Sequence, residues 1–308
     1  MARKRRGNPV HGWLILDKPA GMSSAQAVGA VRRLFEAQKA GHGGTLDPLA
    51  TGVLPIALGE ATKTMAWAMD GLKTYRFTLR WGERRATDDA EGAVTATSDR
   101  RPDRAQVEAA LPAFLGEIQQ RPPEFSAVHL DGERAYDLAR RGESVVLAPR
   151  PVHIESLRLV AVPDLDHAEF EAEVGTGTYV RALGRDLAEA LGTLAHVTRL
   201  RRIRVGPFTE ARAISLENLA SLGHSPGPFG HLLSLETALD DIPALALTEA
   251  EANRLRCGQT VLLLRPSDRA YVLELGDGHR IRATCGEKLV ALAEIAAGAL
   301  RPVRVLNL

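Results

Sequence analysis

The hydrophobic periodicity of this chain changes near residue 243, and that change most restricts its possible folds. Before this point, segments with apolar residues at helical spacing alternate irregularly with segments of strand-like alternation. The helix-like segments are 23–35, 104–115 and 180–191, and the strand-like segments are 13–16, 74–80, 154–162 and 168–174. Because this order lacks the even strand–helix rhythm of a doubly wound sheet, we expect an α+β fold with a mixed, largely antiparallel sheet.

The last part of the chain has a different pattern. A turn-rich segment at 223–230 is followed by Asp240-Asp241-Ile242-Pro243, where we place a domain boundary. Beyond it, short strand-like runs occur at 260–264, 270–275, 280–284, 288–295 and 302–306. Five short strands separated by turns are typical of a small β-barrel. We therefore expect one domain at 1–243 and a second, β-barrel domain at 244–308.

Composition excludes several classes of protein. With 45% hydrophobic and 25% charged residues the chain has an ordinary globular composition. No apolar run approaches the ~20 residues that span a bilayer, so we expect no membrane partner. The two cysteines, Cys257 and Cys285, are too few for a four-cysteine zinc site and fit a reducing compartment, which predicts a cytoplasmic protein.

The net charge of +1 conceals a clustered distribution of arginine. Of the 39 basic residues 33 are Arg, and clusters occur at 3–6 and 199–204. Arg binds phosphate through paired hydrogen bonds, so such clusters can form basic patches on a neutral protein. A GC-rich genome that replaces Lys codons by Arg codons explains the same composition equally well.

The densest chemical signal is the glycine-rich segment Gly41 to Pro55, which contains Asp47. Its glycines make the backbone permissive, and Pro48 disfavours helical geometry at Asp47, so the carboxylate is held on an irregular loop. Either Asp47 faces a pocket, or it closes an Asx turn with its own backbone. The segment does not match a phosphate-binding P-loop, and His42 has no partner at metal-ligand spacing. No serine lies in a nucleophile elbow.

Three other features have both a functional and a structural interpretation. Tyr75 lies on the apolar side of its strand and is typical of a core residue. The acidic run 87–92 lacks the alternate ligands of a calcium loop, so a solvated turn is the simplest interpretation. Gly175 to Arg181 is a glycine-rich approach to a helix that can bring Tyr179 and Arg181 beside a ligand, although Arg at a helix start is usually solvated.

In their order along the chain, these segments resemble the bacterial tRNA pseudouridine-55 synthases, the TruB family. The matching motifs are 16–19 with 21–24, 41–55 with 59–63, Tyr75, and 177–181 with 200–202. The resemblance runs almost collinearly through 10–215, and the tail from about 245 is similar to the family's PUA domain. It implies a pseudouridine-synthase fold with a small PUA-like, RNA-binding domain.

The resemblance implies an enzyme that isomerises uridine to pseudouridine at position 55 in the T loop of tRNA, with no cofactor and no metal. Asp47 is then the catalytic aspartate that supports breakage of the N-glycosidic bond and formation of a C-glycosidic bond. Attack on C1′, attack on the base and a glycal intermediate all stay open. Tyr75 stacks on the target base and helps to remove its C5 proton, and Arg181 pairs with Asp47 and keeps it ionised.

The resemblance also implies a set of substrate-binding residues. Asp89 completes an Asp–Arg–Asp network, and Tyr179 and Leu200 line the pocket. Lys18, with Pro19, supports the loop that holds Tyr75. Because the target base is stacked inside the T loop it must flip out, and His42 fills the space that it leaves.

The implied partner is tRNA, contacted through its T arm and acceptor stem. An Arg-rich insertion at 121–150 would close on the RNA, the PUA-like domain would touch the acceptor stem, and nothing requires an obligate protein partner or more than a monomer. Three departures from the family pattern weaken individual contacts: Arg85-Ala86 stands where Thr-Asp is usual, Phe125 replaces Tyr, and His129 replaces Lys.

Two alternative functions stay open. The Arg clusters and the tail equally support a tRNA-binding folding chaperone without essential catalysis, and Asp47 could be the nucleophile of an N-glycoside hydrolase. The combination of Asp47, Tyr75 and Arg181 favours the isomerase over the chaperone. A hydrolase is disfavoured because no second carboxylate occupies a recognisable water-activating position.

Overall fold

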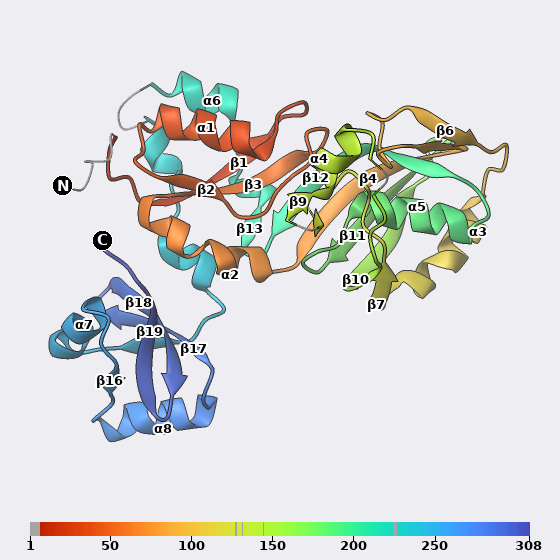
Figure 1. Cartoon of the computed structure of the whole chain (residues 1–308). Helices are drawn as coiled ribbons and strands as arrows, with labels where there is room; N and C mark the ends of the chain where they lie inside the picture. The colour runs from red at the N-terminus through yellow and green to blue at the C-terminus, as the bar shows by residue number, and fades with distance from the viewer. Residues whose placement is uncertain (1–6, 127, 131, 144, 224–226) are drawn as a thin grey trace.

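A computed structural model describes residues 7–126, 128–130, 132–143, 145–223 and 227–308, and its largest sheet has ten strands in this part of the chain (Figure 1). In spatial order these are β14 (Ile214–Ser215), β1 (Gly12–Lys18), β3 (Thr51–Leu58), β12 (Ala195–Val205), β4 (Lys73–Trp81), β11 (His167–Val174), β10 (Arg150–Ala161) and β7 (Gly116–Gln120), with β2 (Ala40–His42) on β3 and β13 (Phe208–Thr209) on β12. Within this sheet, only the pairs β1–β14 and β3–β12 are parallel in the described residues. The predicted α+β fold with a mixed, largely antiparallel sheet is therefore confirmed.

Strand β4 lies inside this sheet and shows how the sequence pattern sets the two faces. It pairs antiparallel with β11 on one side and β12 on the other. Phe77 and Leu79 point into the core and are buried, whereas Arg76 is exposed. The alternation of apolar and polar residues thus predicts the buried face correctly.

The helices of this part lie close to the predicted ranges. They are α1 (Ser24–Leu34), α2 (Met65–Asp70), α3 (Arg104–Ala110), α4 (Ala135–Arg140), α5 (Val180–Ala190) and α6 (Leu216–Ser221). Ser23 caps α1 in a capping box with Gln26. The predicted helix at 104–115 is shorter, because Pro112 lacks a backbone N–H and residues Leu111–Phe114 form a 3₁₀ turn instead.

Two small hairpins extend from the large sheet. One consists of β5 (Glu83–Arg85) and β6 (Val94–Thr97), and the acidic run lies between its strands. The other consists of β8 (His129–Leu130) and β9 (Glu133–Arg134), which precede α4. The second hairpin and α4 pack on a small core of their own formed by Ala135, Val145 and Leu147.

The end of the chain forms a curled, half-barrel sheet of five strands (Figure 1). Its order is β15 (Ala244–Ala246), β17 (Arg280–Cys285), β18 (Lys288–Ala296), β19 (Ala299–Val305) and β16 (Val261–Leu262), with α7 (Glu249–Arg256) and α8 (Pro266–Leu275) beside it. Its core includes Leu255, Val261, Ile281 and Leu300.

One predicted strand here is wrong, and one observed strand was not expected. Residues 270–275 belong to helix α8, which begins with Pro266 at its first position. Tyr271, Val272 and Leu275 face the core at helical spacing, but Leu273 is also apolar although it is 71% exposed, which hides the helical period. The fifth strand is β15, three residues long.

A shared core joins the half-barrel to the large sheet. Trp13 of β1 and Phe208 of β13 pack in the same cluster as Leu289, Leu292 and Leu306. In addition, Lys63 Nζ donates to the Val305 carbonyl at 2.7 Å, and the Asn307 N–H donates to the Glu60 carboxylate at 2.8 Å.

Candidate active site

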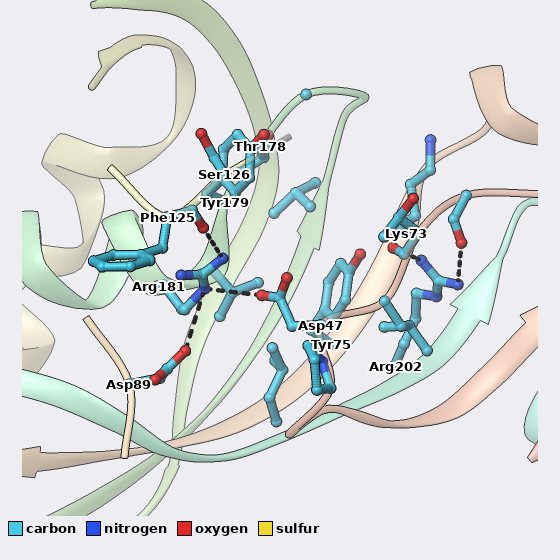
Figure 2. A pocket seen from close by; sticks show the side chains of 18 of the residues that line it. Asp47, Lys73, Tyr75, Asp89, Phe125, Ser126, Thr178, Tyr179, Arg181 and Arg202 are labelled. Atoms are coloured by element: carbon cyan, nitrogen blue, oxygen red, sulfur yellow. Dashed lines mark hydrogen bonds and ion pairs between the residues drawn. The ribbon is translucent and has the colours of Figure 1, made fainter. Parts of the chain in front are cut away.

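A cavity of about 470 Å³ opens where the β2–β3 loop, β4, β12 and the start of α5 meet (Figure 2). Its lining includes residues from six or more separate segments of the chain. Among them are Asp47, Lys73, Tyr75, Asp89, Phe125, Ser126, Thr178, Tyr179, Arg181, Leu200 and Arg202. The structure therefore brings most of the predicted site residues into one cavity.

Asp47 lies on the irregular loop between β2 and β3, and its carboxylate is held from one side by Arg181. Arg181 Nε donates to Asp47 Oδ2 at 2.8 Å, and the same nitrogen lies 3.7 Å from Asp89 Oδ2 (Figure 2). The Asp47 side chain is 31% exposed, whereas Arg181 and Asp89 are almost fully buried. The predicted Asp–Arg–Asp arrangement is present, with Asp47 as its accessible end.

The guanidinium of Arg181 is anchored by backbone as well as by carboxylates. It donates to the carbonyls of Thr87 at 2.9 Å and Phe125 at 3.0 Å. The interpretation of Arg181 as a solvated helix-start residue is thus wrong. Burial opposes its charge, but Asp47 and Asp89 outweigh burial and raise the pKa of Arg181.

Asp88 and Asp89 of the acidic run are buried, whereas Ala90 and Glu91 are exposed, so the simplest interpretation of a solvated turn is corrected for the two aspartates. The Val197 N–H donates to the Asp88 carbonyl and the Ala90 N–H to the Val197 carbonyl, both at 3.0 Å, so the turn is attached to β12. Arg185 donates to Asp88 Oδ2 at 2.9 Å. Burial raises the pKa of Asp88 to about 6, and the nearby Arg185 and Arg181 only partly offset this effect.

The unusual Arg85 supports this same turn. It donates to the carbonyls of Ala90 at 3.2 Å and Gly92 at 3.1 Å and pairs with Glu83. The departure from the family pattern at Arg85-Ala86 is therefore accommodated inside the turn, beside Asp89.

Lys18 and Ser24 hold the Asp47 loop through hydrogen bonds to its backbone. The Lys18 ammonium donates to the carbonyls of Pro19, Met22 and Pro48 at 2.7–3.2 Å. Because the side chain is fully buried, the pKa of Lys18 is lowered to about 8. Ser24 Oγ accepts from the Leu46 N–H at 2.8 Å and donates to the Leu46 carbonyl at 3.0 Å. The expectation that Lys18 supports a loop holding Tyr75 is wrong, because Tyr75 is on strand β4 and Lys18 supports the loop of Asp47.

Arg202 holds the same loop from the other end, so this member of the cluster at 199–204 is not part of a basic surface patch. Its side chain is buried and donates to the carbonyls of Val53 at 2.8 Å, Thr45 at 3.1 Å and Gly44 at 3.0 Å. The backbone also approaches closely here, because a Cβ at Gly52, whose φ is +98°, would lie 2.2 Å from the Arg202 carbonyl oxygen.

The other arginines of this cluster differ from Arg202. Arg201 pairs with Asp17 at 2.9 Å and with Glu210 at 3.2 Å, and Arg204 pairs with Glu173 at 3.3 Å. Arg199 is exposed. A cluster of arginines in the sequence therefore divides in three dimensions into one buried organiser, two ion-paired residues and one exposed residue that makes no ion pair with the described part of the chain.

Tyr75, Tyr179 and Leu200 also line the cavity. Tyr75 is half-buried and contacts the core while it faces the cavity, so it is not the enclosed core residue that its pattern indicates. The Tyr179 N–H donates to Gln120 Oε1 at 2.8 Å, and Arg150 lies 5.3 Å from the centre of its ring. Leu200 is 6% exposed and lines the cavity from β12.

His42, like Lys18, is a predicted site residue that does not line the cavity. It ends strand β2, opposite Ile56, and its Nδ1 has no hydrogen-bond partner among the described residues. Burial and the nearby Arg202 lower the pKa of His42. The residue lies next to the Asp47 loop in sequence, and its predicted role in the flipped-out state stays a prediction.

The segment after β7 supplies the wall opposite the Asp47 loop. Phe125 lines the cavity and packs edge-on against Tyr136, and Arg140 lies 4.4 Å above the Tyr136 ring centre. His129 is exposed on β8. Since the Phe125 carbonyl accepts from Arg181, the substitution of Tyr by Phe leaves this backbone contact available.

Sequence reasoning did not single out several polar residues of the cavity, among them Lys73, Ser126 and Thr178. Lys73 begins β4, two residues before Tyr75, and the hydroxyls of Ser126 and Thr178 are buried without a hydrogen-bond partner among the described residues. Thr178 lies inside the motif 177–181 and Lys73 lies close to Tyr75, which were the available signals. Ser126 carried none.

Two further features are absent from the described residues. No group of three or more His, Cys, Asp or Glu side chains there has the geometry to hold a metal ion. No helix in the same residues is long and apolar enough to cross a bilayer.

Comparison with family models and with known proteins gives a consistent match. Residues 32–180 match the model described as TruB family pseudouridylate synthase (N terminal domain), and residues 181–240 match the tRNA pseudouridylate synthase B C-terminal domain. The chain is 56% identical to the tRNA pseudouridine synthase B of Caulobacter vibrioides and 51% identical to that of Rhodospirillum rubrum, with 100% of both chains covered in each case.

Solved structures match the fold at lower sequence identity. A chain from a Cbf5-Nop10-Gar1 complex superposes with a TM-score of 0.70 at 24% identity and covers 92% of this chain and 78% of that one. A chain from an H/ACA RNP bound to a substrate RNA containing 2′-deoxyuridine gives 0.73 at 21% identity, with 100% and 92% covered. The overall fold is therefore one that these structures share.

Proposed function

The chain belongs to the TruB family of pseudouridylate synthases and is a pseudouridine synthase, and from this premise we propose that it isomerises uridine 55 in the T loop of tRNA. The observation that carries the proposal is the placement of Asp47, which is held by buried Arg181 and exposed to a cavity lined by Tyr75 and Leu200. The named relatives act on tRNA by their printed names, and their full-length match supports the same class of substrate.

The chemistry needs one accessible carboxylate and a dry pocket. The N1–C1′ bond of uridine breaks, the base turns, a C5–C1′ bond forms, and the C5 proton leaves while N1 gains one. Asp47 stabilises the electron-poor sugar or base as the first bond breaks, and Arg181 fixes the carboxylate and keeps it ionised. No water is consumed, so the reaction needs no second carboxylate to activate one, and the buried Arg181–Asp89 pair serves to hold Asp47.

The remaining residues position the nucleotide. The target base leaves its stack at a cost of a few kcal/mol and packs between Tyr75 and Leu200. The orphaned hydroxyls of Ser126 and Thr178 then gain hydrogen-bond partners on the nucleotide. Tyr75 is placed to help remove the C5 proton, and Asp89 holds Arg181 from its far side.

We also propose how the rest of the chain contacts tRNA. The wall containing Phe125 and Tyr136 covers the T arm, and the half-barrel that begins at β15 contacts the acceptor stem. His42 fills the space that the flipped base leaves. The protein acts as a monomer in the cytoplasm.

The first prediction tests the reaction and the role of Asp47 together. Incubation with unmodified tRNA labelled with tritium at uridine C5 releases tritium without added metal, and Asp47→Asn lowers the rate on the order of 10³-fold or more because the carboxylate is lost. Binding of tRNA to the variant, measured by filter retention, stays within a few-fold of wild type.

Other outcomes separate the alternatives. If wild type binds tRNA but releases no label, a folding chaperone without essential catalysis explains the protein better. If free uracil accumulates, the site is that of an N-glycoside hydrolase. Label release from a transcript in which uridine 55 is replaced by cytidine would contradict the assigned position.

A further inference from the structure

The electrostatics of the cavity are uneven on the two sides of Asp47. Figure 2 shows Arg181 on one side of Asp47 and Lys73 with Arg202 on the other. Arg181 is neutralised by Asp47 and Asp89. No described carboxylate forms an ion pair with Lys73 or Arg202, so this side of the cavity retains positive charge.

The charged groups of Lys73 and Arg202 have different hydrogen-bond acceptors. In the described residues, the Arg202 guanidinium donates hydrogen bonds to carbonyls of the Asp47 loop and of β3. Its role is therefore to stabilise the fold of this loop. The Lys73 ammonium donates to the Met69 carbonyl and to Thr176 Oγ1, the latter at 2.8 Å. An ammonium has three protons, and these two neutral acceptors leave one donor for another group.

The position of Lys73 makes this charge costly without a ligand. The residue is only 8% exposed, yet it lines the cavity. Burial and the nearby Arg202 lower the pKa of Lys73 to about 8, against the weaker effect of Asp70, so the amine is still mainly protonated at neutral pH. A buried cation that makes no ion pair with the described residues is stabilised when an anion comes within contact distance.

We propose that Lys73 binds the backbone phosphate adjacent to the flipped target nucleotide. The inference rests on the proposed function, because an RNA substrate is what brings a phosphate to the cavity. The base occupies the part of the cavity lined by Tyr75 and Leu200, and Asp47 meets the ribose. The phosphate then occupies the side opposite Arg181, where Lys73 supplies the free charge.

The test compares Lys73→Gln with Lys73→Arg and with Lys39→Gln. Gln removes the charge but keeps an N–H donor for the Met69 carbonyl and Thr176, Arg keeps the charge, and Lys39 is exposed and outside the cavity. For Lys73→Gln we expect about tenfold weaker tRNA binding and a slope of log Kd against log salt that is smaller by about 0.7, the value for one phosphate contact on a single strand. Lys73→Arg keeps most of the slope, and Lys39→Gln keeps all of it.

A chemically modified substrate identifies the contacted group. A tRNA with a neutral methylphosphonate next to the target uridine binds wild type about tenfold more weakly, and Lys73→Gln binds it no more weakly than it binds the normal tRNA. The inference is overturned if Lys73→Gln binds the methylphosphonate tRNA more weakly than the normal tRNA, so that the two losses add. It is also overturned if Lys73→Gln keeps the wild-type salt slope, even if the variant binds tRNA more weakly. These results are separate from the proposed function, which fails only if wild type forms no pseudouridine in the normal tRNA.

Discussion

The two walls of the cavity are held by different kinds of interaction. The Asp47 loop is held by Lys18, Ser24 and Arg202, whose buried side chains bond its backbone from three elements. The opposite wall, containing Phe125 and Tyr136, rests on the satellite core of Ala135, Val145 and Leu147. Around it, Arg141 pairs with Glu133 and Glu143 on an exposed surface.

This difference assigns separate tasks to the walls. A catalytic carboxylate must keep its position to within a fraction of an ångström, and buried hydrogen bonds from several elements provide that rigidity. A wall with few buried apolar contacts opens at a lower free energy than the global unfolding of the protein. We infer that the Asp47 wall is preorganised and that the facing wall adjusts to the RNA.

The largest expected effect comes from breaking the rigid wall at Arg202. Arg202→Met leaves the carbonyls of Gly44, Thr45 and Val53 without their donor, which lowers the free energy of unfolding by about 3–5 kcal/mol. Displacement of Asp47 by about 1 Å lowers the rate of pseudouridine formation roughly 10²-fold. Urea unfolding and tritium release at saturating tRNA measure the two effects.

The matched control for this variant is on the same strand. Arg199 is exposed, so Arg199→Met changes the free energy of unfolding by less than about 0.5 kcal/mol. Equal destabilisation by both substitutions would show that Arg202 is not the organiser of the loop.

A smaller effect, on KM and not on the main thermal transition, is expected in the wall containing Phe125 and Tyr136. Leu147→Ala removes apolar contacts from the satellite core, and the wall then opens locally, which raises KM for tRNA roughly tenfold. The main thermal transition stays at its wild-type temperature. Hydrogen exchange by mass spectrometry locates the increased exchange in the peptides that cover residues 128–143.

The control in this wall is Arg141→Gln, which breaks only exposed ion pairs and leaves both KM and the thermal transition at wild-type values. If Leu147→Ala instead lowers the main transition, the satellite core is continuous with the main core and the contrast between the walls is lost.

A third expected effect is a pH dependence of stability at Asp88, in the turn attached to β12. The folded pKa of about 6 is higher than that of the unfolded carboxyl, so between pH 4 and 6 the folded state binds the proton more tightly. The contribution of this group to the free energy of unfolding therefore falls as pH rises through this window, by about 1–3 kcal/mol. Asp88→Asn removes that contribution and tolerates the positive φ of 58°.

Urea unfolding at pH 4.5 and pH 7 for both proteins checks the sign. Other carboxylates contribute equally to both, so the difference between variant and wild type isolates Asp88. A larger advantage of the variant at pH 4.5 than at pH 7 would contradict the assigned direction.

The sequence predicted the parts of the fold that depend on local pattern. The capped helix that begins after Ser23, the alternating strand with Tyr75 and the irregular loop with Asp47 all follow from residues close together in the chain. Helix α8 did not follow, because Leu273 is apolar on an exposed position and mimics a strand.

The site itself depends on contacts between distant segments. Asp47 and Arg181 are 134 positions apart, and Arg202 meets Gly44 across 158 positions. Composition cannot tell that Arg202 is buried while Arg199 is exposed, because burial is decided by the strand pairing that places Arg202 opposite Gly52. The motif resemblance grouped Asp47, Tyr75 and Arg181 correctly, but the partners of Lys18 became visible only in three dimensions.

The core shared between the two sheets has a consequence for how the protein is made. Trp13 precedes Leu306 by 293 positions, yet both belong to the same cluster. Synthesis proceeds from the N-terminus at about 5–20 residues per second, so β1 is made well before Leu306 and waits for it before this cluster can close. A chain stopped before Leu306 therefore leaves part of the cluster around Trp13 open to water.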